Sequence, residues 1–399
     1  MRNTIFAVLM LVVSPVLASA SVTPDAISNA FGTGKLVGEI GINFRIDHAD
    51  DPSVVEEGDI GIAFAELDFK TRAFYNFSAG LNFIAVGEIW SDDAWNDNGF
   101  NDGGNFQQNA ILRHASLTYA IPGTKTSVLA GRDLFEMPPT MDGDSHQGVQ
   151  LLSEDIPSVI LTLSAINRWI ENATTDYSMD GIDKSWRDCN DDPEGASSTA
   201  YMLFARINLL EEELTLSPFL GHQSGVLSTY GASLEFSQAI NDKLSVGLDG
   251  TYAFYEEDTD DSSDEDASSY LAHATVFYAN FWIGSGYYVM SDDNRVGATA
   301  VGNNSFDPME EGVYGAEPGD TTFYLDAGYS QGPFELAVVL GNTEIDSSIA
   351  GDEGCTELDV YLTYKFSETA QVELMFVNID DDNSARDYQV YAGGLKMTF

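Results

Sequence analysis

Apolar and polar residues alternate along most of this chain from residue 35 onward. In the final segment, 385–399, every second residue is apolar or small, and these residues are Tyr391, Gly393, Leu395, Met397 and Phe399. A period of two predicts a β-strand whose two faces meet different surroundings. Most other segments repeat the pattern, so each predicted strand has one apolar face.

The first predicted strand begins at Lys35 and has a polar face opposite its apolar face. Its apolar or small positions are Leu36, Gly38, Ile40, Ile42, Phe44 and Ile46, and its polar positions are Glu39, Asn43, Arg45 and Asp47. The following strand places four charges on one face, and these are Glu66, Asp68, Lys70 and Arg72. Charges in such a row need water. The pattern therefore predicts polar faces toward a water-filled interior and apolar faces outward.

Connections of two lengths separate the predicted strands. Short turns fall near residues 76–78, 122–124, 154–156, 210–212, 241–243, 279–280, 331–333 and 367–369. Longer connections lie near 48–59, 91–109, 135–145, 169–198, 223–228, 256–268, 291–320, 344–355 and 380–385. The strands between them match the ~9–11 residues that a tilted strand needs to cross a bilayer. We predict an all-β fold, a transmembrane antiparallel up-and-down β-barrel of about 18 strands (16 as the alternative), with short periplasmic turns and long extracellular loops.

The last strand needs a partner on both edges, because each unpaired backbone group in lipid costs several kcal/mol. The first strand is the most economical partner, and pairing with it closes the sheet. Phe399 then lies at the membrane boundary of the closing strand, where aromatic residues are favoured.

Two segments precede the predicted barrel. Residues 1–20 contain Arg2, an apolar run at 5–16 and the sequence Ala18-Ser19-Ala20, which is typical of a signal peptide. Residues 21–34 predict a short helical or irregular lead-in that ends at glycine. No later apolar run reaches the roughly eighteen residues of a transmembrane helix. We therefore expect residues 35–399 to form one barrel domain in a bacterial outer membrane.

The chain is strongly acidic, with 17 basic and 64 acidic residues and a net charge of −47. Nucleic acid and anionic headgroups are poor partners for such a chain. The acidity fits solubility in a salty medium, and it also fits attraction of cations to a channel mouth. The two interpretations are compatible.

The chain has two cysteines, Cys189 and Cys355, so it is not a disulfide scaffold. The alternation of short and long connections places both of them in loops on the outer side, where disulfides persist. Two alternatives stay open at this point. A bridge would clamp the loop at 169–198 over the mouth, or the two residues are incidental loop cysteines.

The stretch 131–149, Gly-Arg-Asp-Leu-Phe-Glu-Met-Pro-Pro-Thr-Met-Asp-Gly-Asp-Ser-His-Gln-Gly-Val, resembles the third loop of OprD-type porins, including the major outer-membrane proteins of related bacteria. In that family Gly-Arg precedes a proline and an Asp-rich turn that folds into the pore. The lead-in at 30–38, Ala-Phe-Gly-Thr-Gly-Lys-Leu-Val-Gly, and the terminal Phe399 look similar as well. The resemblance implies a constriction loop at about 135–145 that carries Asp142, Asp144 and His146. The chain departs from the family in its acidity and in its cysteine-bearing loop.

Basic residues on the inner wall form a ladder for carboxylates in such porins. By alternation the candidates are Arg45, Lys70, Arg72 and Arg206, and Arg132 is added on the resemblance. The alternative is that each basic residue neutralises a wall carboxylate such as Glu66. Arg113 and Arg132 have the same parity as their apolar neighbours, which means that they fall on the apolar positions of the alternation. This indicates a bulge or a misassigned register there.

Two clusters suggest other chemistry. The acidic run at 256–266 could gather calcium, but it lacks the spacing of an EF-hand, and a solvated surface loop is the favoured interpretation. The identity of any bound metal is left undecided. His114, Ser116 and His146 lie in no spacing typical of a catalytic triad, so an enzyme is not expected.

Together these features predict a passive porin for small hydrophilic solutes and ions, without a cofactor, that prefers cations at low salt. We expect contact with outer-membrane lipid and consider a homotrimer possible. The alternative function is a structural or adhesin-like surface barrel whose long acidic loops bind a partner. A soluble secreted β protein is disfavoured, because nearly every strand has an apolar face directed outward.

Overall fold

In the computed structural model, the described residues are 24–49, 58–91, 110–136, 145–170, 187–188, 199–210, 213–224, 227–257, 266–291, 309, 319–347, 351–382 and 384–399. The predicted signal peptide lies outside them. So do Asp142, Asp144, Cys189 and most of the acidic run at 256–266. None of the helices in the described part of the chain combines the length and hydropathy needed to cross a membrane.

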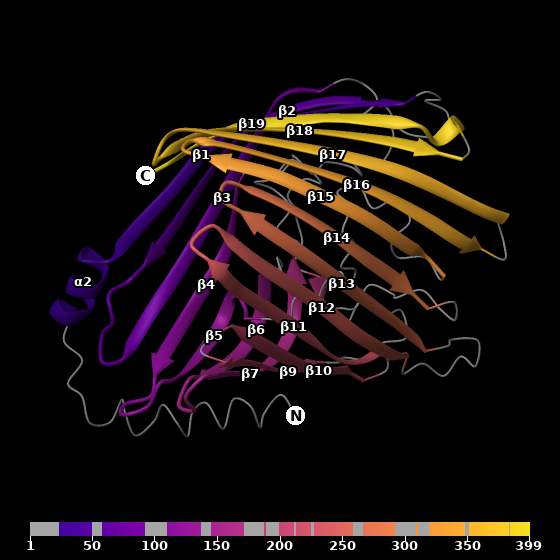
Figure 1. Ribbon diagram of the computed structural model, residues 1–399. Coiled ribbons are helices and arrows are strands. Elements are labelled where there is room, and N and C mark those ends of the chain that lie inside the picture. The colour runs from indigo at the N-terminus through magenta and orange to yellow at the C-terminus, as the bar shows by residue number, and fades with distance from the viewer. Residues whose placement is uncertain are drawn as a thin grey trace.

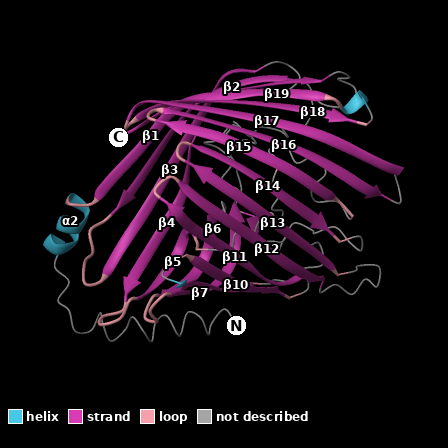
Figure 2. Ribbon diagram, in the orientation of Figure 1, coloured by secondary structure: helices cyan, strands magenta, loops and turns pink. Residues whose placement is uncertain are grey.

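Almost every described residue belongs to a strand (Figure 2). The strands are β1 (Lys35–Ala49), β2 (Gly58–Lys70), β3 (Phe77–Ser91), β4 (Ala110–Ala120), β5 (Thr126–Leu134), β6 (Ser145–Ser153), β7 (Val159–Ile170), β8 (Arg187–Asp188), β9 (Ala200–Leu209), β10 (Leu214–Gln223), β11 (Leu227–Asn241), β12 (Leu244–Glu257), β13 (Ala267–Tyr278), β14 (Phe281–Met290), β15 (Thr321–Gln331), β16 (Phe334–Ser347), β17 (Gly351–Ser367), β18 (Ala370–Asp381) and β19 (Tyr388–Thr398). The helices are α2 (Pro24–Gly32) and the 3₁₀ turn η3 (Ser384–Arg386), which lie at opposite rims (Figure 2).

The sheet closes on itself. Apart from β8, each strand pairs antiparallel with the next, and β1 pairs with β19 over a register that runs from Glu39 opposite Thr398 to Ala49 opposite Tyr388. The two-residue β8 pairs only with β7, and β7 also pairs directly with β9. Without β8, the nineteen labelled strands give a closed barrel of eighteen, visible as a tilted array in Figure 1. This confirms the predicted fold and count and excludes the alternative of sixteen.

The two faces of the wall follow the predicted pattern in β1. Ile40, Ile42 and Ile46 are 44%, 48% and 38% exposed, whereas Asn43 and Arg45 are buried. Exposed large apolar side chains continue around the outer face, among them Phe83, Leu117, Leu163, Leu203, Leu220, Leu248, Ile283, Leu325, Leu340 and Leu374. An outer apolar band that is not covered by protein is what lipid requires.

The inner face is not uniformly polar. The register of β1 with β2 places Ile60 and Ile62 in the inner rows of Arg45 and Asn43, and both isoleucines are almost fully buried with Phe64, Ile84 and Val86. Similar buried apolar clusters line the inner face of β9–β13 and β17–β19. All lie toward the strand ends that carry the longer connections. Alternation alone missed this, because β2 has apolar residues on both faces in that half.

Two predicted positions need correction. The sequence predicts a long connection at 344–355. In the structure, β16 continues to Ser347 and β17 begins at Gly351. Cys355 therefore lies inside a strand, buried in the inner row opposite Thr343, and not in a loop. The polar and glycine-rich composition suggested a loop because this part of the wall carries few apolar residues. Arg72 is the second case, since β2 ends at Lys70 and the N–H of Arg72 donates to the carbonyl of Ala30 in α2.

Candidate pore constriction

The chain turns into the barrel immediately after β5. Phe135, the first residue beyond Leu134, is 6% exposed and packs with Ile166, Ala200 and Met202. The register of β7 with β9 places Ile166 opposite Ala200, in the inner rows of the wall. The first residue of the predicted constriction loop is thus held against the inner wall by apolar contact.

Hydrogen bonds fix the next residue, Glu136. Its N–H donates to Oε1 of Gln150 at 3.1 Å, and its carbonyl accepts from Nε2 of Gln150, also at 3.1 Å. The same Nε2 donates to Oγ of Ser164 at 2.9 Å. The Glu136 carboxylate lies 3.5 Å from Nη2 of Arg206 across the lumen side of β9. A buried amide and an ion pair therefore hold this end of the loop.

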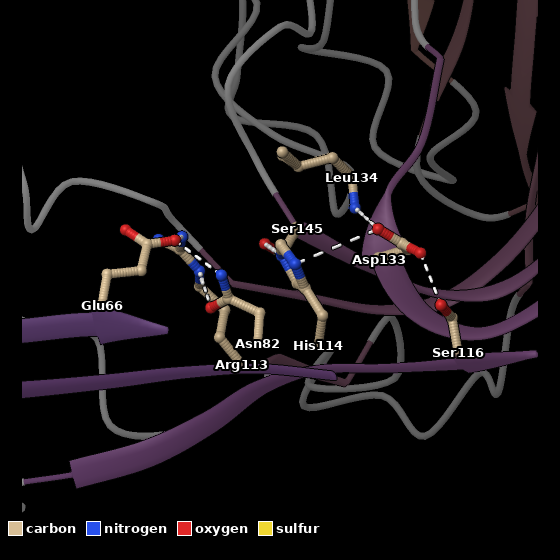
Figure 3. Close-up of polar contacts among 8 residues, drawn as sticks. All are labelled: Glu66, Asn82, Arg113, His114, Ser116, Asp133, Leu134 and Ser145. Carbon is tan, nitrogen blue, oxygen red and sulfur yellow. Dashed lines mark hydrogen bonds and ion pairs between the residues drawn. The ribbon is translucent and has the colours of Figure 1, made fainter. Parts of the chain in front are cut away.

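The other end of the loop is buried as well. Ser145 and His146, the first residues of β6, have no exposed surface. Oγ of Ser145 lies 2.7 Å from Nε2 of His114 on β4, and the ring of His146 lies 5.7 Å from that of Phe135 between centroids. Leu134 and Ser145, the strand residues that flank this connection, are cross-strand neighbours beside His114 (Figure 3).

A polar network continues from this anchor along β2–β5 (Figure 3). Arg113 is paired with the carboxylate of Glu66 and donates from Nε to Oδ1 of Asn82 at 3.2 Å. Oγ of Ser116 donates to Oδ2 of Asp133 at 2.6 Å. A shift in the β3–β4 register, between Asn82 and Phe83, places the neighbours Arg113 and His114 both on the buried side. This is the irregularity that the parity of Arg113 indicated.

His114, Ser145 and Asp133 lie together but do not form a catalytic triad. Nδ1 of His114 is 3.9 Å from Oδ1 of Asp133, which is too far for a hydrogen bond. Ser145 has no surface that a substrate could reach. The three residues join β4, β5 and β6 at the loop anchor.

The predicted basic residues are not gathered at one place. Arg45 is buried on β1 and donates from Nε to Asp47, at 2.8 Å to Oδ1 and 3.0 Å to Oδ2. Lys70 occupies an inner row opposite Lys35 at the end of β2, and Arg206 an inner row opposite Ile160. Arg132 lies opposite Ala115 and donates to Gln147 at 2.9 Å, so its register row is the outward one and not a lumen-facing one.

Sequence reasoning missed three parts of this site. Glu66 was named only as a counter-charge, and neither Gln150 nor Phe135 was singled out, because an isolated glutamine or phenylalanine carries no signal of its own. The third part is Met309, in the connection between β14 and β15. Its side chain lies over Gly341 in an inner row of β16, where an added Cβ would stand 2.9 Å from Cε of Met309. This connection therefore also reaches the inner wall.

Among the described residues, no group of three or more His, Cys, Asp or Glu side chains is arranged to hold a metal ion. The acidic run at 256–266 lies largely outside the described residues, so calcium binding there stays a prediction.

Comparison with known proteins identifies the class of barrel. OccAB4 of Acinetobacter baumannii superposes with a TM-score of 0.74 at 14% identity, over 92% of this chain and 98% of that chain. A BenF-like porin from Pseudomonas fluorescens Pf-5 gives 0.76 at 10% identity, over 93% and 99%. OccK1 (OpdK) of Pseudomonas aeruginosa gives 0.72 at 12% identity, over 92% and 98%. These identities show a shared fold.

No curated protein sequence matches the chain. The family model described as Campylobacter major outer membrane protein matches residues 35–390, which is nearly the whole predicted barrel. That family consists of porins and not of enzymes. The chain therefore belongs to the Campylobacter major outer membrane protein family, and is a β-barrel porin of the bacterial outer membrane.

Proposed function

We propose that this porin provides passive diffusion for small hydrophilic solutes and ions, and that it prefers cations at low salt. No cofactor takes part in such diffusion. The observation that supports the preference is the charge of the inner wall, which can be counted from the strand register.

Acidic residues in the inner rows outnumber basic ones. The acidic residues are Glu39, Asp47, Glu66, Asp68, Glu88, Asp133, Glu235, Asp249, Asp326, Glu335, Glu357, Asp359, Glu373 and Asp381. The basic residues are Lys35, Arg45, Lys70, Arg113, Arg206, Lys365 and Lys396. Among the inner-row residues whose side chains the structure describes, fourteen carboxylates thus face seven cations. A wall with this excess attracts cations and repels anions.

The test is the reversal potential of single channels in a planar bilayer under a salt gradient. Cation preference is expected at about 0.01 M salt, where the Debye length is ~30 Å, and should nearly vanish at about 1 M, where it is ~3 Å. Anion preference at low salt contradicts the proposal. A purified, folded barrel that never conducts favours the alternative, a surface barrel that binds a partner through its loops.

The proposal includes assembly as a homotrimer. Its support is Arg132, which lies in an outward row beside Gln147. A basic residue on the lipid face destabilises a barrel by an amount that falls from the bilayer midplane toward the interfaces, and contact with a second barrel lowers that cost. Chemical cross-linking in detergent measures the state, and a monomer alone contradicts this part of the proposal.

A further inference from the structure

Three side chains from separate strands meet on the inner wall, on strands other than β5 and β6. His273 on β13 lies between two carboxylates, with Nδ1 3.1 Å from Oδ1 of Asp249 and Nε2 2.7 Å from Oδ1 of Asp326. Asp249 is the direct cross-strand neighbour of His273 on β12. Asp326 belongs to β15, so it reaches His273 across the whole of β14.

Two glycines of β14 make this reach possible. Gly284 lies opposite Asp326, and a Cβ there would stand 2.6 Å from Nε2 of His273 and would also collide with the Asp326 carboxylate. Gly286 lies opposite Tyr324, and a Cβ there would collide with the tyrosine ring. That ring instead stacks on the imidazole, with 5.4 Å between centroids and 25° between planes. At these two positions β14 therefore contributes backbone alone, and side chains of β13 and β15 meet above it.

The number of hydrogen-bond donors fixes the charge of this arrangement. A neutral imidazole carries one N–H and one lone pair, whereas an ionised carboxylate only accepts. Both contacts of His273 are hydrogen bonds only when the ring holds two protons, or when one carboxyl is protonated. With a doubly protonated ring, the three residues carry a net charge of −1. Loss of that proton turns one contact into a lone pair facing a carboxylate and changes the net charge to −2.

The neighbouring strands supply no permanent cation in place of that proton. On β13 the hydroxyl of Thr275 lies 3.4 Å from Nε2 of His273. On β11, Glu235 faces Asp249, and on β15 the remaining titratable neighbour is Tyr324. Among the described inner-row residues of β11–β15, none is a lysine or an arginine.

The opposite wall differs in this respect. Counted without β8, β3 and β13 are nine positions apart in the ring of eighteen, which is half a turn. Near β3, the carboxylate of Glu66 is paired with Arg113, whose charge does not titrate. One side of the lumen thus has a fixed counter-charge, and the other has a counter-charge that depends on pH. Asp249 is 44% exposed at its side chain, so water and ions reach the titratable side.

We propose that His273, held between Asp249 and Asp326, sets the cation selectivity of this pore as a function of pH. The proposal rests on the channel function proposed above and adds the residue that adjusts it. When the ring is doubly protonated, it cancels one of the two carboxylates. When the ring is neutral, the wall gains one negative charge beside the permeation path, and cations are favoured more strongly over anions.

The test is the ratio of cation to anion permeability at low salt, measured from reversal potentials between about pH 5 and pH 8, which span the ordinary histidine value of about 6.5. For the wild-type porin we expect the ratio to rise about tenfold with pH, because one unit charge roughly 6 Å from a permeating ion, at the dielectric constant of water, favours a cation about threefold and disfavours an anion about threefold.

Two substitutions separate the charge of residue 273 from its shape. His273→Gln removes the titration and should hold the ratio near the high-pH level of the wild-type porin throughout. His273→Lys supplies a permanent cation and should hold it near the low-pH level. The matched control is His222→Gln, because His222 lies in an outward row of β10 and bonds Ser228 at 3.0 Å, so it should retain the wild-type slope.

Substitution of one of the two carboxylates tests the same inference without relying on the histidine variants to fold. Asp326→Asn removes one charge and should lower the ratio at every pH. The inference is overturned if His273→Gln keeps the wild-type slope, if Asp326→Asn leaves the ratio unchanged, or if the wild-type porin conducts with a selectivity that does not depend on pH. A wild-type protein that never conducts overturns the proposed function instead, so the two failures are distinguishable.

Discussion

Asp155 joins two turns at the rim that carries the short connections. Its Oδ1 accepts from the backbone N–H of Lys125 at 2.6 Å, and its Oδ2 accepts from Oγ1 of Thr126 at 2.6 Å and from Oγ of Ser153 at 3.4 Å. The bond from Thr126, followed by that from Lys125, holds the pKa of the Asp155 carboxyl below its ordinary range. One side chain thus ties the turn after β4 to the turn after β6.

This depressed pKa predicts a pH-dependent contribution to stability. The contribution is fully present above the ordinary aspartate value of about 3.9 and is lost as the pH falls through the lower folded-state value. Asp155→Asn should therefore lower the temperature at which the barrel loses its compact electrophoretic mobility at neutral pH, and the difference from wild type should shrink in acid. Glu154→Gln in the same turn is the control. A difference that persists unchanged at pH values well below that of an aspartate would argue against this role.

Arg113 shows where prediction from the sequence stops at the scale of a residue. Its position in the alternation is that of its apolar neighbours, which indicates a bulge or a misassigned register, and one extra residue in β4 does shift the register against β3. The sequence signalled an irregularity, but a bulge depends on which residues oppose it on the neighbouring strand. The pairing of Arg113 with Glu66 could be known only after that register was known.

At the scale of elements, the connection between β5 and β6 is described at its two ends. The Gly-Arg and proline pattern predicts a connection after β5, and β5 ends at Leu134 while β6 begins at Ser145; that this connection constricts the pore stays a prediction. The anchors could not be predicted, because Phe135 follows β5 whereas Gln150 and Arg206 lie on β6 and β9, and these parts of the chain converge only in the closed barrel. The interior beyond the loop shows the same limit, since Met309 reaches β16 from a connection with no recognisable motif.

Gln150 tests whether the anchor controls the pore. Gln150→Ala removes both hydrogen bonds to the Glu136 backbone and the one to Ser164. We expect larger single-channel conductance and more open-channel noise, because the loop is no longer held in one place. Gln389→Ala is the matched control, since that amide bonds Asn378 on β18 in an outward row. Identical conductance and noise in Gln150→Ala and wild type would show that this anchor does not affect permeation.

At the scale of the whole molecule, the inner wall has apolar zones. The buried apolar clusters lie toward the longer connections, where inner-row carboxylates such as Asp47 and Asp381 also lie. The closed barrel of eighteen strands could be predicted, because hydrophobic period and connection length are local properties. The zones could not, because an apolar inner row is stable only when other segments of the chain cover it, and burial of that kind is a property of the assembled interior.

The closing seam is the last feature on which the whole barrel depends. Beyond the β1–β19 register, Phe399 and Gly38 exchange both backbone hydrogen bonds at 2.9 Å, and the Phe399 ring lies over Gly38, where a Cβ would stand 2.6 Å from Cε2. Phe399→Asp removes that cover and places a charge at the membrane boundary, and Gly38→Val displaces the ring. Both should therefore lower the yield of heat-modifiable barrel, whereas Phe399→Leu should keep most of it. Because the two residues are in contact, Gly38→Val should cost less in a Phe399→Leu background than in the wild-type chain. Equal losses in the two backgrounds, or a normal yield from Phe399→Asp, would show that the barrel closes without this contact.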